Sequence, residues 1–252
     1  MALGPRLIDA ATFTLVRLGA GALTLVLLAT SAGHGRRGGS WPSALALIAY
    51  AAGFSFAYLR LTAAVGALIL FGAVQLTMVG AGLARGERPV PREWLGLGLA
   101  VAGLVWLTRP DASAPDPLGV VLMLAAGASW GIYSLRGRGV QQPLAATADN
   151  FVRALPAAVA VSLVTLGHAH VTARGVGLAA ASGALASGVG YSVWYAALRG
   201  LTATRAAVVQ LLVPVLAALG AVLLLHEHLG ERLLVAGAAI ICGVAIAVLG
   251  RR

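Results

Sequence analysis

The chain has 252 residues, of which 60% are hydrophobic and only 10% are charged. A soluble globular domain has about a quarter of its residues charged. This composition, with a mean hydropathy of +0.91, therefore excludes that class and indicates a membrane protein. The net charge of +10 comes from 18 basic residues, all of them arginine. Most arginines stand at the ends of apolar runs, which is typical of orientation signals in a membrane and argues against a nucleic-acid partner.

Nine apolar runs follow one another, each close to the roughly 20 residues that a helix needs to cross a bilayer. Breaks rich in Gly, Pro and Arg separate them, as expected of loops. The pattern predicts an all-α polytopic membrane protein with nine transmembrane helices and no separate soluble domain. We expect these helices at residues 11–31, 42–59, 62–84, 93–108, 118–135, 149–167, 176–198, 203–225 and 233–250. The start "MALGPRLIDAATF" lacks the compact basic segment of a signal peptide.

The arginines outside the helices are distributed unevenly between alternate loops. Eleven lie on one side and five on the other if the C-terminus is cytoplasmic. Positive residues favour the cytoplasmic side, so we expect a multi-pass protein of the cytoplasmic membrane with its C-terminus inside.

A repeat links the two halves of the chain. Residues 61–92 read "LTAAVGALILFGAVQLTMVGAGLARGERPVPR", and residues 201–232 read "LTATRAAVVQLLVPVLAALGAVLLLHEHLGER". Five predicted spans separate the two copies, so an odd number of crossings gives them opposite orientations. At the constant offset of 140, identical residues pair as Gly80 with Gly220, Glu87 with Glu227, Arg92 with Arg232 and Gly103 with Gly243. We therefore expect a first repeat of four helices at 1–116 and a second of five at 117–252.

Inverted repeats are the sequence signature of secondary transporters, because two oppositely oriented halves can exchange conformations and open a central site to each side in turn. The pairing also fails in an informative way. The predicted helix at 118–135, which opens the second half, has no partner in the first half. We therefore expect that one helix is missing from the start of the first repeat.

Three features of the chain resemble a known family. They are the pair Trp130-Gly131, the early Arg153 in the next helix, and the long run from Leu201 to Leu249. In order and spacing they resemble the EamA-type branch of the drug/metabolite transporter superfamily. The resemblance implies ten helices in two inverted five-helix repeats, both termini cytoplasmic, and outward movement of small metabolites, often amino acids or drugs.

The chain departs from that family pattern at two points. It lacks the first helix, so either its start is assigned too late or it is a degenerate nine-helix form. Val74 also stands where the second copy has Pro214, so a hinge supplied by proline would exist in one copy only.

Polar residues inside the predicted spans are the first candidates for substrate binding, because a polar side chain in hydrocarbon needs a partner or a cavity. Gln75 and Gln210 lie well within their helices, and hydrogen bonding between helices is the alternative role. Arg17 and Arg153 lie early in two helices and could attract a carboxylate. Their alternative is to extend toward the interface, or, for Arg153, to pair with Asp149 four residues before it.

Aromatic residues are the second set of candidates. Trp130 and Tyr133 are three residues apart, and Tyr191, Trp194 and Tyr195 follow three-and-four spacing, so each group can present one helical face. Such rings offer a ligand apolar contact and a polar end. The alternative is the aromatic belt at the membrane surface, especially for Tyr133 and Tyr195. Trp130 is the stronger candidate, because the family resemblance places it beside the pathway.

Other kinds of chemistry find little support in the sequence. The segments "HAH" at 168–170 and "HEH" at 226–228 lack the HExxH spacing of a zinc enzyme, so we expect surface histidines there and no metal. The lone Cys242 lies in an apolar run, which excludes a disulfide framework. Since no motif of a nucleophile, a catalytic base or a phosphate-binding loop is present, we expect neither an enzyme nor a cofactor.

The sequence favours a secondary transporter that moves small metabolites by alternating access, as an exporter. One alternative is a translocator of lipids or lipid-linked sugars, and another is a membrane scaffold that transports nothing. The expected partners are a small-molecule substrate and membrane lipid, and a homodimer is left open. Substrate-binding candidates are Arg17, Gln75, Trp130, Tyr133, Arg153, Tyr191, Trp194 and Gln210.

Overall fold

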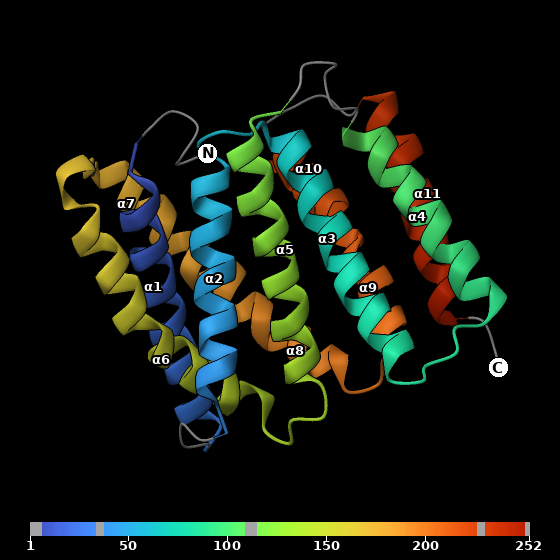
Figure 1. Cartoon of the computed structure of the whole chain (residues 1–252), viewed down its shortest axis with the longest axis horizontal. Helices are drawn as coiled ribbons and strands as arrows, with labels where there is room; N and C mark the ends of the chain where they lie inside the picture. The colour runs from blue at the N-terminus through green and yellow to red at the C-terminus, as the bar shows by residue number, and fades with distance from the viewer. Residues whose placement is uncertain (1–6, 34–37, 109–114, 226–229, 250–252) are drawn as a thin grey trace. The chain divides into compact units, whose positions relative to one another are not determined.

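A computed structural model describes residues 7–33, 38–108, 115–225 and 230–249 (Figure 1). Within them the helices group into nine spans, which confirms the predicted all-α polytopic membrane fold. Six are long and apolar enough to cross a membrane. The elements are α1 (Ala10–Ser31), α2 (Trp41–Ala57), α3 (Ala63–Ala84), α4 (Pro91–Thr108), α5 (Pro117–Gly137), α6 (Pro143–Val164), η1 (Leu166–His168), the continuous α7 (Ala173–Ala181), η2 (Ser182–Val189) and α8 (Gly190–Leu198), then α9 (Ala203–Gln210), α10 (Leu212–Leu225) and α11 (Glu231–Leu249).

Most of the helices begin where the local sequence supplies a cap. An oxygen-bearing side chain at the N-cap accepts a hydrogen bond from a free N–H of the first turn. Helices α2, α5 and α6 also have proline in their first turn, where its missing N–H costs nothing. The capping residues are Asp9, Ser40, Thr62, Asp116, Thr172 and Thr202.

Three predicted helices differ from those observed. Helix α6 begins at Pro143 rather than 149, because proline fits the first turn of a helix. The span expected at 176–198 is interrupted by the π-helical segment η2, which contains Gly183, Ser187 and Gly188. The span expected at 203–225 breaks between Gln210 and Leu212. Pro214 cannot donate a hydrogen bond to Gln210, four residues before it, so the helix breaks there.

The chain forms two compact units, which do not follow the expected repeat boundary. Unit 1 comprises Met1–Leu61 and Asp116–Gly200, and unit 2 comprises Thr62–Pro115 and Leu201–Arg252. Each unit therefore takes helices from both halves of the chain. The division into repeats at 1–116 and 117–252 concerns sequence relatedness, and it stays a prediction.

In unit 2, helix starts recur at the offset of 140 found in the sequence. Helices α3 and α9 both begin one residue after a capping threonine, Thr62 or Thr202, and α4 and α11 begin at Pro91 and Glu231. The copies differ in one respect: α3 continues past Val74, whereas the second copy breaks before Pro214. This agrees with the expectation that any proline hinge is one-sided.

Close packing of α4 on α11 repeats the same offset (Figure 1). Adding 140 to Gly96 and Gly103 gives Ala236 and Gly243, and these four residues form two related contacts, Gly96 with Gly243 and Gly103 with Ala236. A Cβ on Gly243 would lie 2.5 Å from the Gly96 carbonyl oxygen, and one on Gly103 would lie 3.0 Å from that of Ala236. The two helices can approach this closely only because the glycines carry no side chain.

In unit 1, α1 packs against α6 and η2, and α2 packs against α5 (Figure 1). A Cβ on Gly183 of η2 would overlap the carbonyl oxygen of Arg17 in α1. Glycine at this position therefore brings the π-helical segment against α1 at the level of a buried arginine.

Candidate functional site

Arg17 is the charged residue around which the candidate site is organised. It lies on α1 in unit 1, and only 7% of it is exposed. Its Nε donates a hydrogen bond to Ser187 Oγ at 3.0 Å. The π-helical segment η2 carries this serine, which is 1% exposed.

Two rings of α2 cover the Arg17 guanidinium. Its Cζ lies 5.8 Å from the ring centroid of Tyr50 and 5.6 Å from that of Phe54. These distances are within the range of cation–π attraction. Tyr50 and Phe54 are four residues apart on one helix, so they share a face.

Further rings extend the cluster beyond Tyr50. Trp130 of α5 lies 5.0 Å from Tyr50 and 4.8 Å from Tyr191 of α8, between ring centroids. Tyr133, one turn after Trp130, lies 5.9 Å from it, and Phe151 of α6 packs edge-on against Tyr191 at 5.3 Å. We call the set of Arg17, Tyr50, Phe54, Trp130, Tyr133, Phe151 and Tyr191 the aromatic cluster.

Four of the eight candidates predicted from sequence thus meet in one place: Arg17, Trp130, Tyr133 and Tyr191. Tyr50, Phe54 and Phe151 were not predicted as site residues. The four-residue spacing of Tyr50 and Phe54 is a signal that could have singled them out, because Tyr191 and Tyr195, which were assigned to one helical face, have the same spacing.

Trp194 has a different environment from the cluster. Its Nε1 donates to Ser134 Oγ at 3.3 Å, and in the part of the chain that the structure describes it makes no ring–ring contact. Its neighbour Tyr195 donates its hydroxyl to the Tyr133 carbonyl oxygen at 3.2 Å. These two hydrogen bonds join α8 to α5 beside the cluster.

The contacts of Arg153 also differ from those of the aromatic cluster. It forms an ion pair with Asp149, with Nε 3.1 Å from Oδ1, and its guanidinium lies over the Trp41 ring at 5.4 Å. Asp149 in turn accepts a hydrogen bond from the Gly39 backbone N–H. The pairing weighed as the alternative for Arg153 is therefore present, and the resemblance between Arg17 and Arg153 does not extend to their surroundings.

Gln75 and Gln210 lie in unit 2, where both are buried. Gln75 Nε2 donates to the Ala207 carbonyl oxygen at 2.7 Å, and Gln210 Nε2 lies 2.9 Å from Met78 Sδ. Hydrogen bonding between helices, the alternative role for these residues, therefore occurs. The Gln75 amide nevertheless keeps one unused hydrogen-bond acceptor, because its Oε1 is buried without a hydrogen-bond partner.

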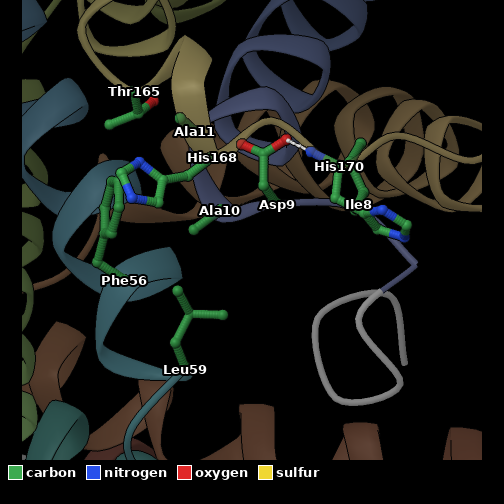
Figure 2. A pocket seen from close by; sticks show the side chains of 9 residues that line it. All are labelled: Ile8, Asp9, Ala10, Ala11, Phe56, Leu59, Thr165, His168 and His170. Carbon is green, nitrogen blue, oxygen red and sulfur yellow. Dashed lines mark hydrogen bonds between the residues drawn. The ribbon is translucent and has the colours of Figure 1, made fainter.

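Two cavities lie within unit 1. The larger, about 600 Å³, is lined at the start of α1, the end of α2 and the region of η1 by Ile8, Asp9, Ala10, Ala11, Phe56, Leu59, Thr165, His168 and His170 (Figure 2). The smaller, about 70 Å³, is lined among others by Ser43, Tyr133, Arg136 and Asn150. The Tyr133 hydroxyl is buried without a hydrogen-bond partner, so the aromatic cluster borders a small polar space.

Asp9 organises the rim of the larger cavity. Its carboxylate accepts a hydrogen bond from the backbone N–H of His170 at 3.2 Å (Figure 2). It accepts a second from the backbone N–H of Thr12 at 2.9 Å. Partial burial raises the pKa of Asp9, but these hydrogen bonds outweigh it and leave the pKa below its ordinary value. Two histidines of the "HAH" segment thus line a cavity. The described residues contain no group of three side chains suited to hold a metal ion.

The arrangement defines a class: a helical membrane bundle whose buried polar and aromatic side chains meet between helices. Residues 117–249 match the model of the EamA-like transporter family. The chain is 51% identical over 245 residues to a Pseudomonas aeruginosa protein described as "Uncharacterized protein PA1977", covering 95% of this chain and 84% of the relative. The chain belongs to the EamA-like transporter family.

A solved crystal structure shares the fold. It superposes with a TM-score of 0.79 at 19% sequence identity, over 98% of this chain and 89% of the other. At this identity the likeness concerns the fold alone.

Proposed function

We propose that the protein is a secondary transporter that exports small metabolites across the cytoplasmic membrane by alternating access. The observation that carries the proposal is the repeated register of unit 2. Helix starts and the glycine contacts between α4 and α11 recur at one offset of 140 residues. Two related and oppositely oriented halves are the structural basis of alternating access in secondary transporters.

Buried polar side chains support the same proposal. Arg17, Gln75 and Gln210 are each less than 9% exposed within apolar helices. A polar group in hydrocarbon is costly unless it faces a partner or a water-filled cavity. In transporters such residues mark the substrate pathway. Gln75 retains a free acceptor atom in addition to its contact with α9. An amide positioned in this way can accept a hydrogen bond from a substrate.

Flux measured in cells tests the proposal. Cells that express the full chain are loaded with labelled compounds that include amino acids, aromatic carboxylates and cationic drugs, and efflux and uptake are followed. We expect one class to move, and we expect Gln75→Leu combined with Gln210→Leu to lower its flux at an equal level of protein in the membrane. Leu76→Ala is the matched control, because Leu76 adjoins Gln75 on α3 but is 77% exposed.

Three outcomes would count against the proposal. Loss of flux in proportion to loss of protein would make the glutamines structural. Movement of lipids between leaflets with no flux of soluble compounds would favour a lipid translocator. No flux of any compound, with the wild-type protein folded in the membrane, would favour a scaffold.

A further inference from the structure

Among the described residues, none supplies a counter-charge to Arg17. In the part of the chain that the structure describes, no carboxylate forms an ion pair with this buried arginine, and its contacts are Ser187, Tyr50 and Phe54. The described carboxylates are engaged elsewhere or begin a helix: Asp9 caps α1, Asp116 pairs with Arg60, Asp149 with Arg153, Glu93 with Arg205, Glu87 accepts from the N–H of Ala203, and Glu231 lies in the first turn of α11.

A buried cation without a counter-ion is costly in a low-dielectric environment, and arginine cannot relieve the cost by losing its proton. The rings of Tyr50 and Phe54 offset part of the cost through cation–π attraction, and the Ser187 hydroxyl accepts one hydrogen bond. Neither contact supplies a negative charge. An anionic ligand would supply it, and a guanidinium is suited to bind a carboxylate through two parallel hydrogen bonds.

The residues around Arg17 indicate what the rest of such a ligand would be. Rings of four helices, α2, α5, α6 and α8, meet one another, and the two rings of α2 lie next to the guanidinium. Phe54 and Trp130 are only partly buried, so part of each residue is not covered by the protein. Flat apolar groups pack well against such faces.

The same charge disfavours other ligands. A ligand ammonium near Arg17 would be repelled at short range in a medium of low dielectric constant, and the two ring faces nearest the guanidinium already hold a cation. None of the described carboxylates is among the contacts of the cluster to balance a second positive charge. Amino acids and cationic drugs, which the family resemblance implied, therefore fit the cluster less well than a simple acid.

We infer that the aromatic cluster binds small organic monocarboxylates with a flat apolar body and no amino group, with Arg17 holding the carboxylate. This inference rests on the proposed function, since it names the class of compound that the transporter would carry. It assigns Arg17 as the residue that determines specificity between anions and cations.

Three compounds that share a phenylethyl group separate the relevant charges. Phenylpropanoate carries a carboxylate, phenylethylamine an ammonium, and phenylalanine both. Equilibrium binding of each labelled compound is measured by scintillation proximity to the purified full chain in nanodiscs of zwitterionic phosphatidylcholine. Such lipid adds no competing anionic headgroup, and at about pH 8 the carboxylates are ionised.

We expect phenylpropanoate to bind at least about tenfold more tightly than the other two compounds. One charge-assisted hydrogen-bonded pair between Arg17 and the carboxylate supplies enough binding free energy for this difference. Arg17→Met should weaken it by about tenfold or more, and Arg17→Lys, which keeps the charge but not the planar fork, by less. Arg60→Met, which removes an exposed arginine paired with Asp116, is the control and should bind like wild type. If Arg17→Met does not fold, Arg17→Lys and Trp130→Leu carry the test.

The inference is overturned if phenylalanine or phenylethylamine binds as tightly as phenylpropanoate, if none of the three binds, or if the Arg17 variants that fold bind it like wild type. The outcome is separable from that of the proposed function. Flux of amino acids or cations with no binding of phenylpropanoate would refute the substrate class and leave the transporter. Arg17-dependent binding of phenylpropanoate without flux of any compound would refute the transporter and leave the ligand class.

Discussion

The two compact units hold their helices together in different ways. In unit 2, α4 and α11 meet through Gly96, Gly103 and Gly243, and small residues set the distance between helices. In unit 1, large rings and one arginine fill the space between α2, α5 and α8. The α4–α11 contact of unit 2 should therefore be sensitive to side chains that become larger, whereas the aromatic cluster of unit 1 should be sensitive to the loss of particular polar atoms and rings.

Enlarging Gly96 should have the largest effect on stability. A Cβ at this position would collide with the Gly243 carbonyl oxygen and lie 2.8 Å from the Ala247 Cβ. Since backbone cannot move aside cheaply, Gly96→Val should destabilise the protein by about 3 kcal/mol or more, or prevent its accumulation. Thermal unfolding in detergent measures the change. Gly98→Ala on the same helix, where a Cβ meets nothing within 4 Å, is the control and should be neutral or stabilising by up to about 1 kcal/mol.

The buried ion pair of unit 2 should contribute more than the exposed pair of unit 1. Glu93 and Arg205 lie 2.7 Å apart with side chains 8% and 15% exposed, whereas Arg60 and Asp116 lie 3.2 Å apart at 46% and 37%. Glu93→Gln leaves a nearly buried cation, and we expect a loss of roughly 2–4 kcal/mol. Asp116→Asn, which retains a good capping residue for α5, should cost at most about 1 kcal/mol. Equal losses of unfolding free energy in the two variants would contradict the claim that burial decides how much each ion pair contributes.

Two tyrosines of unit 1 differ in whether their hydroxyl groups are used. Tyr195 donates to the Tyr133 carbonyl oxygen, so Tyr195→Phe should cost about 1 kcal/mol of unfolding free energy. Tyr133→Phe should be neutral or slightly stabilising in the absence of ligand, because its buried hydroxyl has no partner. A clear destabilisation by Tyr133→Phe would show that the hydroxyl is hydrogen-bonded in the small cavity, either to Thr147 or Asn150 of its lining or to water.

The smallest effect is expected at low pH, from Asp9. Because its pKa is lower in the folded protein than in the unfolded chain, its contribution to stability is present above its ordinary value, about 3.9, and is lost as the pH falls through the lowered value. Unfolding curves at decreasing pH should show this loss in wild type. Asp9→Asn, which keeps a capping side chain, should remove that part of the pH dependence. An unchanged pH dependence in Asp9→Asn would contradict the assignment.

The sequence predicted the fold better than the site, for physical reasons. Apolar length and turn residues depend on neighbours in the chain, so the spans were predicted to within a few residues. The exceptions were the early start at Pro143, the break next to Pro214 and the π-helical segment η2. The last of these depends on the tight packing of Gly183 against α1, which is a tertiary contact.

The sequence does not show which helices are neighbours, and the composition of the aromatic cluster depends on that. Three-and-four spacing identified Trp130, Tyr133 and Tyr191, but only the pairing of α2 with α5 brings Tyr50 to Trp130. Arg17 and Arg153 looked equivalent in sequence. The structure distinguishes them, because Asp149 is one turn from Arg153 while Arg17 is held by rings and a serine.

Counterflow in proteoliposomes tests the central claim, that this protein is an alternating-access carrier, most directly. Vesicles containing the purified chain are loaded with an unlabelled compound that cells expressing it move, and a trace of the labelled compound is added outside. A carrier with one site that faces each side in turn exchanges label inward against its gradient, so we predict a transient accumulation above equilibrium. The accumulation should be lost in Gln75→Leu, Gln210→Leu and kept in Leu76→Ala. Simple equilibration without any overshoot, for every compound tried, would contradict the account.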